Sequence, residues 1–220
     1  MTSYIAPKGA ARLATLAAIA FIGFFILGYG GILIANSNGE SPSPVWPATA
    51  FGLCIMLRLS RSRRDDIVML GAIVLSGLLV NGAAGSPLPL NLGYSLINPL
   101  DVMTGLVAMR RLALPRFNTA KSVARFVLAA VIGPAMIGGL LAGALMWAYD
   151  GHALVPGVKW FVANLLGVCI LFPFGMTVSL RQFAKLKLED RFFEALVVFS
   201  LLGGRPPCWA SGCPPIRCNS

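Results

Sequence analysis

The stretch LATLAAIAFIGFFILGYGGILIA, at residues 13–35, decides the fold class of this chain because it contains no charged residue. A helix needs about 20 mostly apolar residues to cross the hydrocarbon core of a membrane. The apolar part of a cleavable secretory signal is shorter, at roughly 7 to 15 residues. The stretch therefore predicts a retained transmembrane helix, preceded by a short cytoplasmic segment at residues 1–12.

Similar apolar runs continue along the chain, which is 57% hydrophobic and only 12% charged, with a mean hydropathy of +0.78. A soluble domain of 220 residues cannot hide so much apolar surface in one core. The second run is short enough for a re-entrant loop, but the charge pattern favours a full crossing. We expect an all-α, polytopic transmembrane helix bundle of six to seven spans, at about residues 13–35, 43–59, 66–85, 89–109, 126–148 and 159–180, with a partial seventh at 192–204.

Arginine and lysine gather in every second gap between these runs, most densely at residues 58–64, 110–125 and 181–191. Short loops rich in Lys and Arg stay in the cytoplasm during membrane insertion, so the alternation predicts a cytoplasmic N-terminus. The net charge of +10 then suits an anionic inner leaflet, with membrane lipid as a partner. No nucleic acid partner is expected, because the basic residues form no stripe with interleaved aromatic residues.

Residues 205–220 form a segment rich in Pro and Cys that interrupts the seventh apolar run. Its three cysteines have neither a neighbouring His nor the C-x-x-C spacing that is typical of zinc sites, so we expect no metal site there. We expect this segment to be an aberrant terminus, such as a frameshift produces, in place of the remainder of a longer protein.

Glycine and proline recur inside the expected spans. Small residues let neighbouring helix backbones approach closely in a membrane, so close helix packing is the favoured role of the glycines, over a channel or a hinge. Pro99, Pro134 and Pro173 each fall within a span and predict a local kink. The glycines in question are Gly28, Gly30, Gly31, Gly133, Gly138, Gly139 and Gly143.

Asp101 lies near the middle of the fourth expected span. An acidic group at the centre of a transmembrane helix costs about 2.5 to 3.5 kcal/mol on insertion scales, so it should face the bundle interior. Asn98 and Thr104 lie about one turn away on the same face, and Asn81 and Asn164 are candidate partners from other spans. Two interpretations remain open, namely a ligand or proton site and a hydrogen-bond cluster that fixes the bundle.

Trp46 and Thr49 lie in the sequence Trp46-Pro47-Ala48-Thr49, at the outer mouth of the second expected span. Trp suits a membrane interface and Pro suits the first turn of a helix, so interface anchoring is the favoured interpretation. A contribution to a ligand site is the alternative. The chain has no phosphate-binding Gly-rich loop, no Ser/His/Asp grouping and no cluster with metal-ligand spacing, which predicts a protein that is not an enzyme and has no cofactor.

Three segments, taken together, resemble the MASE-type membrane-associated sensor domain of bacteria, first class. They are SPVWPATAFGL at residues 43–53, INPLD at residues 97–101 with the Gly105 and Arg110-Arg111 that follow, and WFVANLLGV at residues 160–168. The resemblance covers residues 10–204 and implies an integral membrane, multi-helix input module. Such modules commonly precede cytoplasmic diguanylate cyclase, phosphodiesterase or histidine kinase domains.

The chain departs from that family at three points. The family commonly has Glu where this chain has Asp101, and Asp where it has Asn164. The glycine that follows Trp-Pro-x-Thr in the family is displaced, with Ala50 in its place and Gly52 two residues later. A ligand site that depends on two acids would be weakened by Asn164.

The resemblance and the polar interior together predict a sensory input domain in signal transduction that lacks its output domain. The expected ligand or signal residues are Asp101, Asn98, Asn164, Asn81, Trp46 and Thr49. The expected partners are an unidentified small-molecule signal and other copies of the chain. A transport component for a small solute or a coupled ion is the alternative, with Asp101 as a proton or cation site. A membrane scaffold or a gene remnant is a third possibility.

Overall fold

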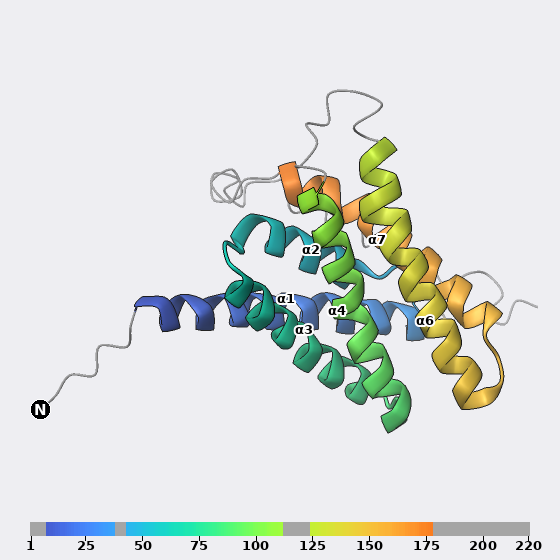
Figure 1. Cartoon of the computed structure of the whole chain (residues 1–220). Helices are drawn as coiled ribbons and strands as arrows, with labels where there is room; N and C mark the ends of the chain where they lie inside the picture. The colour runs from blue at the N-terminus through green and yellow to red at the C-terminus, as the bar shows by residue number, and fades with distance from the viewer. Residues whose placement is uncertain (1–7, 38–42, 112–123, 178–220) are drawn as a thin grey trace, which may run out of the picture. The chain divides into compact units, whose positions relative to one another are not determined.

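The computed structural model describes residues 8–37, 43–111 and 124–177, and these residues form helices joined by short connections (Figure 1). No strand occurs in the described residues, so the all-α prediction is confirmed. The expected partial seventh span and the segment at residues 205–220 lie outside the described residues. The helices are α1 (Lys8–Ser37), α2 (Pro47–Leu59), α3 (Arg63–Ala83), α4 (Leu88–Arg111), the π-helix η1 (Val127–Ile132), α6 (Gly133–Asp150) and α7 (Leu154–Thr177).

Four stretches of helix in the described residues are long and apolar enough to cross a membrane, namely Gly9–Ala35, Arg63–Ala83, Ala124–Asp150 and Leu154–Phe172. The α2 helix has only 13 residues, which at about 1.5 Å per residue falls well short of a hydrocarbon core about 30 Å thick. The described chain thus has the helices of a multi-pass membrane protein. The expected count of six to seven spans is not confirmed.

The α1, α2 and α7 helices begin several residues away from the starts of the expected spans, and α1 begins at Lys8 instead of residue 13. The second was expected from residue 43, but α2 begins at Pro47, because a residue that precedes proline disfavours the helical conformation. Trp46 accordingly has a non-helical backbone, with φ of −114° and ψ of 86°. The last was expected from residue 159, but α7 begins at Leu154, so Lys159 lies inside the helix, where its long side chain can reach the surface.

The short α2 helix lies at the centre of the bundle and packs against α1, α4 and α7. Around it, α3 packs between α1 and α4, and α4 lies between α3 and α6 (Figure 1). The α6 helix packs in turn against α7. More than half of the α2 residues are buried, which is consistent with this central position: Ala48, Thr49, Ala50, Gly52, Leu53, Cys54 and Met56.

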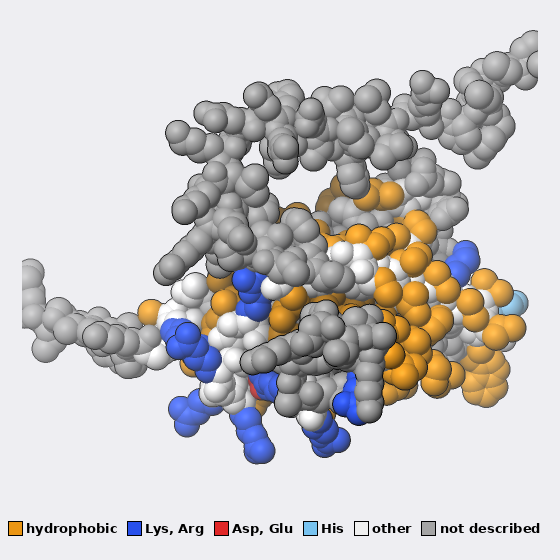
Figure 2. Space-filling view, turned by 90° about the horizontal axis from the view of Figure 1, so that it is seen from above, with side chains coloured by type: hydrophobic (Ala, Val, Ile, Leu, Met, Phe, Trp, Pro, Cys, Tyr) orange, Lys and Arg blue, Asp and Glu red, His pale blue; other side chains and the backbone are white. Residues whose placement is uncertain are grey.

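The core of the bundle consists of apolar side chains from α1, α2, α3, α4, η1 and α7, and Phe126 and Phe172 stack in it with their ring centroids 4.7 Å apart. Large apolar side chains also cover the outside, such as Ile26 at 62% exposure and Leu140 at 69%, as expected of a surface that meets lipid. Figure 2 shows this hydrophobic surface over one part of the visible face, and Lys and Arg side chains gathered at its other end.

Glycines bring α6 and α7 into backbone contact. A Cβ atom added to Gly139 would lie 2.9 Å from the carbonyl oxygen of Gly157, and one added to Gly143 would lie 2.9 Å from that of Ala153. The expected role of these glycines in close helix packing is therefore confirmed at Gly139 and Gly143. It is not confirmed at Gly30, where an added Cβ would meet nothing within 4 Å.

Prolines inside the helices are accommodated without ending them. The α4 helix continues through Pro99, and α7 continues through Pro173. Pro134 follows directly on η1, whose end is marked by a hydrogen bond from the Gly133 N–H to the Leu128 carbonyl oxygen. This wider turn relieves the clash that the Pro134 ring would have with the preceding turn of a regular α-helix.

We expect Gly157→Ala to destabilise the bundle by about 1–3 kcal/mol, a cost typical of overpacking a close contact. The added Cβ would lie 2.8 Å from the backbone carbonyl oxygen of Gly139, and no side-chain rotation can relieve a clash between backbones. Equilibrium unfolding in mixed detergent micelles measures the change. Gly30→Ala is the matched control, and it should leave stability unchanged or raise it slightly. Equal effects of the two substitutions would contradict the proposed contact.

Candidate functional site

A cavity of about 430 Å³ lies at the end of the bundle where α1, α3 and α6 finish and α4 and α7 begin. We call it the polar cavity, because amide, hydroxyl and indole groups interrupt its apolar wall. Lys159, which is exposed, contributes to the wall as well. Its other polar and aromatic lining residues include Trp46, Asn81, Tyr94, Asn98, Trp160 and Asn164.

Two tryptophans in the cavity wall donate their indole N–H groups to the same face of α4. The Nε1 atom of Trp46 lies 3.0 Å from Oδ1 of Asn98, and Nε1 of Trp160 lies 3.2 Å from Oδ2 of Asp101. Asn98 and Asp101 are three residues apart, which is nearly one turn of a helix. The indoles therefore bind to successive turns of α4, one from the start of α2 and the other from α7.

Trp46 is held inside the bundle by its backbone as well as its side chain. Its backbone N–H donates to the carbonyl oxygen of Ala163 in α7 at 2.9 Å. Its indole lies close enough to α1 that a Cβ atom added to Gly28 or Gly31 would contact it. Trp46 therefore contacts α1, α4 and α7, and its expected role as an anchor at the membrane interface stays a prediction.

Asp101 is 1% exposed and does not line the polar cavity. It lies about one helical turn deeper than Asn98 and packs against Gly138 of α6, where an added Cβ would lie within van der Waals overlap of Oδ1. Its hydrogen-bond partner is Trp160, and not Asn81 or Asn164 as the sequence suggested. The Oδ1 atom has no hydrogen-bond partner among the described residues.

Asn164 lines the polar cavity and is 2% exposed. Its Nδ2 atom donates to the carbonyl oxygen of Trp160 at 3.2 Å, which fixes the orientation of the amide. Its Oδ1 atom is buried and has no partner within residues 8–37, 43–111 and 124–177. Asn164 therefore has, beside the cavity, a buried acceptor that no donor of the described residues uses.

The two remaining expected site residues differ in position. Asn81 lines the polar cavity and donates from Nδ2 to Oγ of Ser95 at 3.2 Å, and Ser95 donates in turn to Asn91 at 3.1 Å. This chain of hydrogen bonds joins α3 to α4. Thr49 lies one turn inside α2, is 4% exposed, does not line the cavity, and its Oγ1 atom has no partner in the described part of the chain. The structure thus brings Trp46, Asn81, Asn98 and Asn164 to one cavity, with Asp101 behind them.

Tyr94 and Trp160 were not among the site residues that the sequence predicted, yet both contribute to the site. Their rings stack with centroids 5.1 Å apart and planes 20° apart, and both line the polar cavity. Asn98 donates from Nδ2 to the carbonyl oxygen of Tyr94 at 3.0 Å. The spacing of Tyr94 and Asn98, four residues apart on one helix face, was a signal that could have identified Tyr94.

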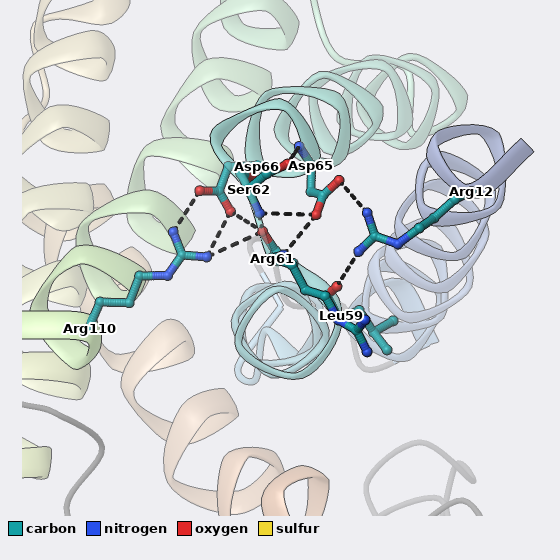
Figure 3. A network of polar contacts seen from close by, with 8 residues as sticks. Arg12, Leu59, Arg61, Ser62, Asp65, Asp66 and Arg110 are labelled. Atoms are coloured by element: carbon teal, nitrogen blue, oxygen red, sulfur yellow. Dashed lines mark hydrogen bonds and ion pairs between the residues drawn. The ribbon is translucent and has the colours of Figure 1, made fainter. Parts of the chain in front are cut away.

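A second polar cluster, which we call the basic-end network, lies at the opposite end of the bundle (Figure 3). Arg12 of α1 pairs with Asp65 of α3 at 2.8 Å and donates to the carbonyl oxygen of Leu59 at 3.1 Å. Asp65 also accepts hydrogen bonds from the backbone N–H groups of Arg61 and Ser62. The network therefore connects α1 to the turn between α2 and α3.

Arg110 closes the other side of the basic-end network. Its guanidinium donates to both carboxylate oxygens of Asp66, at 2.6 and 2.9 Å, and Ser60 donates to the same carboxylate at 2.6 Å. Ser62 and Asp65 form a capping box at the start of α3. These ion pairs were not predicted from the sequence, although the spacing Ser62-x-x-Asp65 before an apolar run is a signal of the capping box.

The α2 helix is hydrogen-bonded to α7 near both of its ends. At the cavity end the link is the Trp46 N–H to the Ala163 carbonyl oxygen. At the basic end, Arg58 donates from its guanidinium to the carbonyl oxygen of Gly175 at 2.5 Å. A displacement of α2 at the polar cavity would therefore reach the end of α7 and the basic-end network.

We expect Arg110→Lys to lower stability by about 0.5–1 kcal/mol, because lysine cannot reproduce the two parallel bonds to Asp66 and the pair is partly exposed. Arg111→Lys is the matched control, since the described residues show no partner for that neighbouring side chain. Unfolding of both variants in mixed micelles measures the difference. A result in which Arg111→Lys costs as much as Arg110→Lys would count against the bidentate pair.

An all-helical bundle with apolar helices long enough to cross a membrane, an internal polar cavity and a charged cluster at the opposite end defines a multi-pass membrane protein. The family model of MASE1, a membrane-associated sensor domain, matches residues 14–204, and the chain belongs to this family. The resemblance drawn from the three sequence segments is thereby confirmed. No curated protein and no solved structure matches the chain.

Proposed function

We propose that this chain is a sensory input module of a bacterial inner membrane, and that it binds a small solute in the polar cavity. Membership of a family of membrane sensor domains supports the sensory role. One observation carries the choice of site, namely that the cavity wall contains two tryptophans that are hydrogen-bonded to α4 beneath it. A ligand that moved either indole would alter buried contacts between three helices.

The proposed mechanism transmits that change through α2. A ligand can shift a bundle between two arrangements only by binding one of them more tightly. The Trp46 and Trp160 indoles provide such a difference, because their hydrogen bonds to α4 break if the rings turn. The α2 helix then carries the displacement to Arg58 and the turn that holds Asp65 and Asp66. An output domain that follows α7 would receive the signal there.

The basic end faces the cytoplasm in this proposal, as does the N-terminus. The arginines of the turn between α2 and α3 lie at the same end as Arg12 and Arg110, and this clustering supports a cytoplasmic assignment. We expect reporter fusions after Arg64 and after Lys121 to be active only in the form that folds in the cytoplasm. Fusions that are active only in the periplasmic form would reverse the topology and with it the side from which a ligand enters.

Hydrogen exchange of the full chain in lipid nanodiscs tests the sensory role. The probe is the small-molecule fraction of spent bacterial culture medium. We expect slower exchange in the cavity segments around residues 88–101 and 154–164, together with altered exchange in residues 58–66 at the far end. Trp160→Ala should remove both effects, and Trp147→Phe, outside the cavity, should retain them.

Two results would overturn the proposed function. One is unchanged hydrogen exchange at residues 58–66 when ligand binding slows exchange in the cavity segments, because binding would then not be transmitted to the far end of the bundle. The other is net accumulation of solute by proteoliposomes that contain the chain, because that result would make it a transporter.

A further inference from the structure

We infer that the polar cavity is selective for a small organic amine, whose ammonium group binds near Asn164 and whose hydrocarbon part lies against the aromatic wall. This inference rests on the proposed function, because it names the chemical class of the ligand for the same site. It is carried by the hydrogen-bonding capacity of the buried groups, by the ring surfaces and by the placement of charge.

Two buried side chains near the polar cavity each have an acceptor atom that no described donor uses. Oδ1 of Asn164 and Oδ1 of Asp101 are both buried and have no partner among the described residues. The indole N–H groups already bind Asn98 and Asp101, and the Asn164 amide already donates to the Trp160 carbonyl oxygen. A buried acceptor without a partner is costly, so a ligand that brings N–H donors is favoured over one that brings only acceptors.

Three aromatic rings contribute to the cavity wall. Trp46, Tyr94 and Trp160 all line it, and the last two are stacked. The face of an aromatic ring attracts a cation, most strongly when the ring is that of tryptophan and water is excluded. The same rings pack well against a hydrocarbon or aromatic body. The wall therefore suits a ligand with a cationic head and an apolar part.

Two ionisable residues near the cavity, Asp101 and Lys159, lie at different depths. Asp101 lies about one helical turn deeper than Asn98, and its hydrogen-bond partner Trp160 lies between it and the cavity. Lys159 is exposed on the wall, where water can solvate its ammonium group. A cationic head is thus favoured deep in the cavity, close to Asn164, and a carboxylate there would face acceptors that repel it.

Three probes with the same ring and different head groups test this assignment, namely benzylamine, benzyl alcohol and benzoate. Their affinities for the full chain in nanodiscs can be followed by the change in tryptophan emission. We expect benzylamine to bind at least about tenfold more tightly than benzyl alcohol, since hydrogen bonds to charged groups are the stronger ones, and benzoate to bind least. Trp147→Phe should leave this order unchanged, because Trp147 lies outside the polar cavity.

Two variants locate the head group. Asn164→Leu should weaken benzylamine about tenfold while leaving benzyl alcohol less affected, and Asn164→Asp should strengthen benzylamine. The second variant keeps the test decisive if the first fails to fold. Equal affinities for benzylamine and benzyl alcohol, tighter binding of benzoate, no binding of benzylamine, or weaker binding of benzylamine to Asn164→Asp would each overturn the inference. An exchange response to the culture fraction alongside any of these results would leave the sensory role intact and reject only the amine.

Discussion

Replacing Gly167 by alanine will separate the start of α2 from α7 and will destabilise the bundle by about 3 kcal/mol or more, a magnitude that is reached when a core contact is badly overpacked. An added Cβ at this position would fall within van der Waals overlap of the Trp46 carbonyl oxygen and 3.3 Å from the Pro47 nitrogen. Both atoms belong to the backbone, so the clash can be relieved only by moving a helix. Equilibrium unfolding in mixed micelles measures the loss.

Gly71→Ala provides the control for this substitution. Gly71 is also a helical glycine, but it is exposed on α3 and an added Cβ would meet nothing within 4 Å. Alanine should there raise stability slightly, by about 0.5–1 kcal/mol, because it favours the helix more than glycine does. If Gly167→Ala proved as well tolerated as Gly71→Ala, α2 could not pack against α7 as described.

The second large effect is expected when Trp160 is replaced by phenylalanine. The ring that stacks on Tyr94 is kept, but the N–H donor to Asp101 is lost. The carboxyl group of Asp101 is then left with neither oxygen bonded by a described residue, which costs about 1–3 kcal/mol for a buried polar group.

A double-mutant cycle separates this hydrogen bond from packing effects. In the Trp160→Phe background, Asp101→Ala should cost at least about 1 kcal/mol less than it does in the wild type, because the bond is already absent. The control cycle pairs Asp101→Ala with Trp147→Phe, which is 66% exposed and outside the cavity; its two effects should add. Additive effects in the Trp160 cycle would mean that the indole and the carboxyl group are not coupled.

Local properties of the sequence were enough to predict the helices and one of their contacts. A run of apolar residues such as 13–35 favours a membrane helix whatever surrounds it, and α1 covers that run. Small residues favour close approach, and Gly139 and Gly143 do contact α7. The depth of Asp101 inside the bundle also followed from position alone, because a carboxyl group in the middle of an apolar helix must avoid lipid.

The positions of the tryptophans could not be predicted in the same way. The partners of Trp46, which are Asn98 in α4 and the Ala163 carbonyl oxygen in α7, depend on how these helices pack around the short α2. Likewise, an unpaired acid predicts some partner but not its identity, and Asp101 meets an indole instead of an amide. At the basic end, the count of arginines indicates a side of the membrane, whereas the pairs with Asp65 and Asp66 depend on how α1 and α4 approach α3.

The hydrogen bond between the Trp46 amide and the Ala163 carbonyl oxygen has a consequence for biogenesis. The ribosome synthesises Trp46 long before Ala163, and the non-helical backbone of Trp46 has no hydrogen-bond partner within its own helix. Lipid cannot form hydrogen bonds with the backbone groups that this segment exposes before α7 is present. The nascent α2 segment should therefore remain in the translocon or in water until α7 has been synthesised, and should enter the membrane as one of the last steps of assembly.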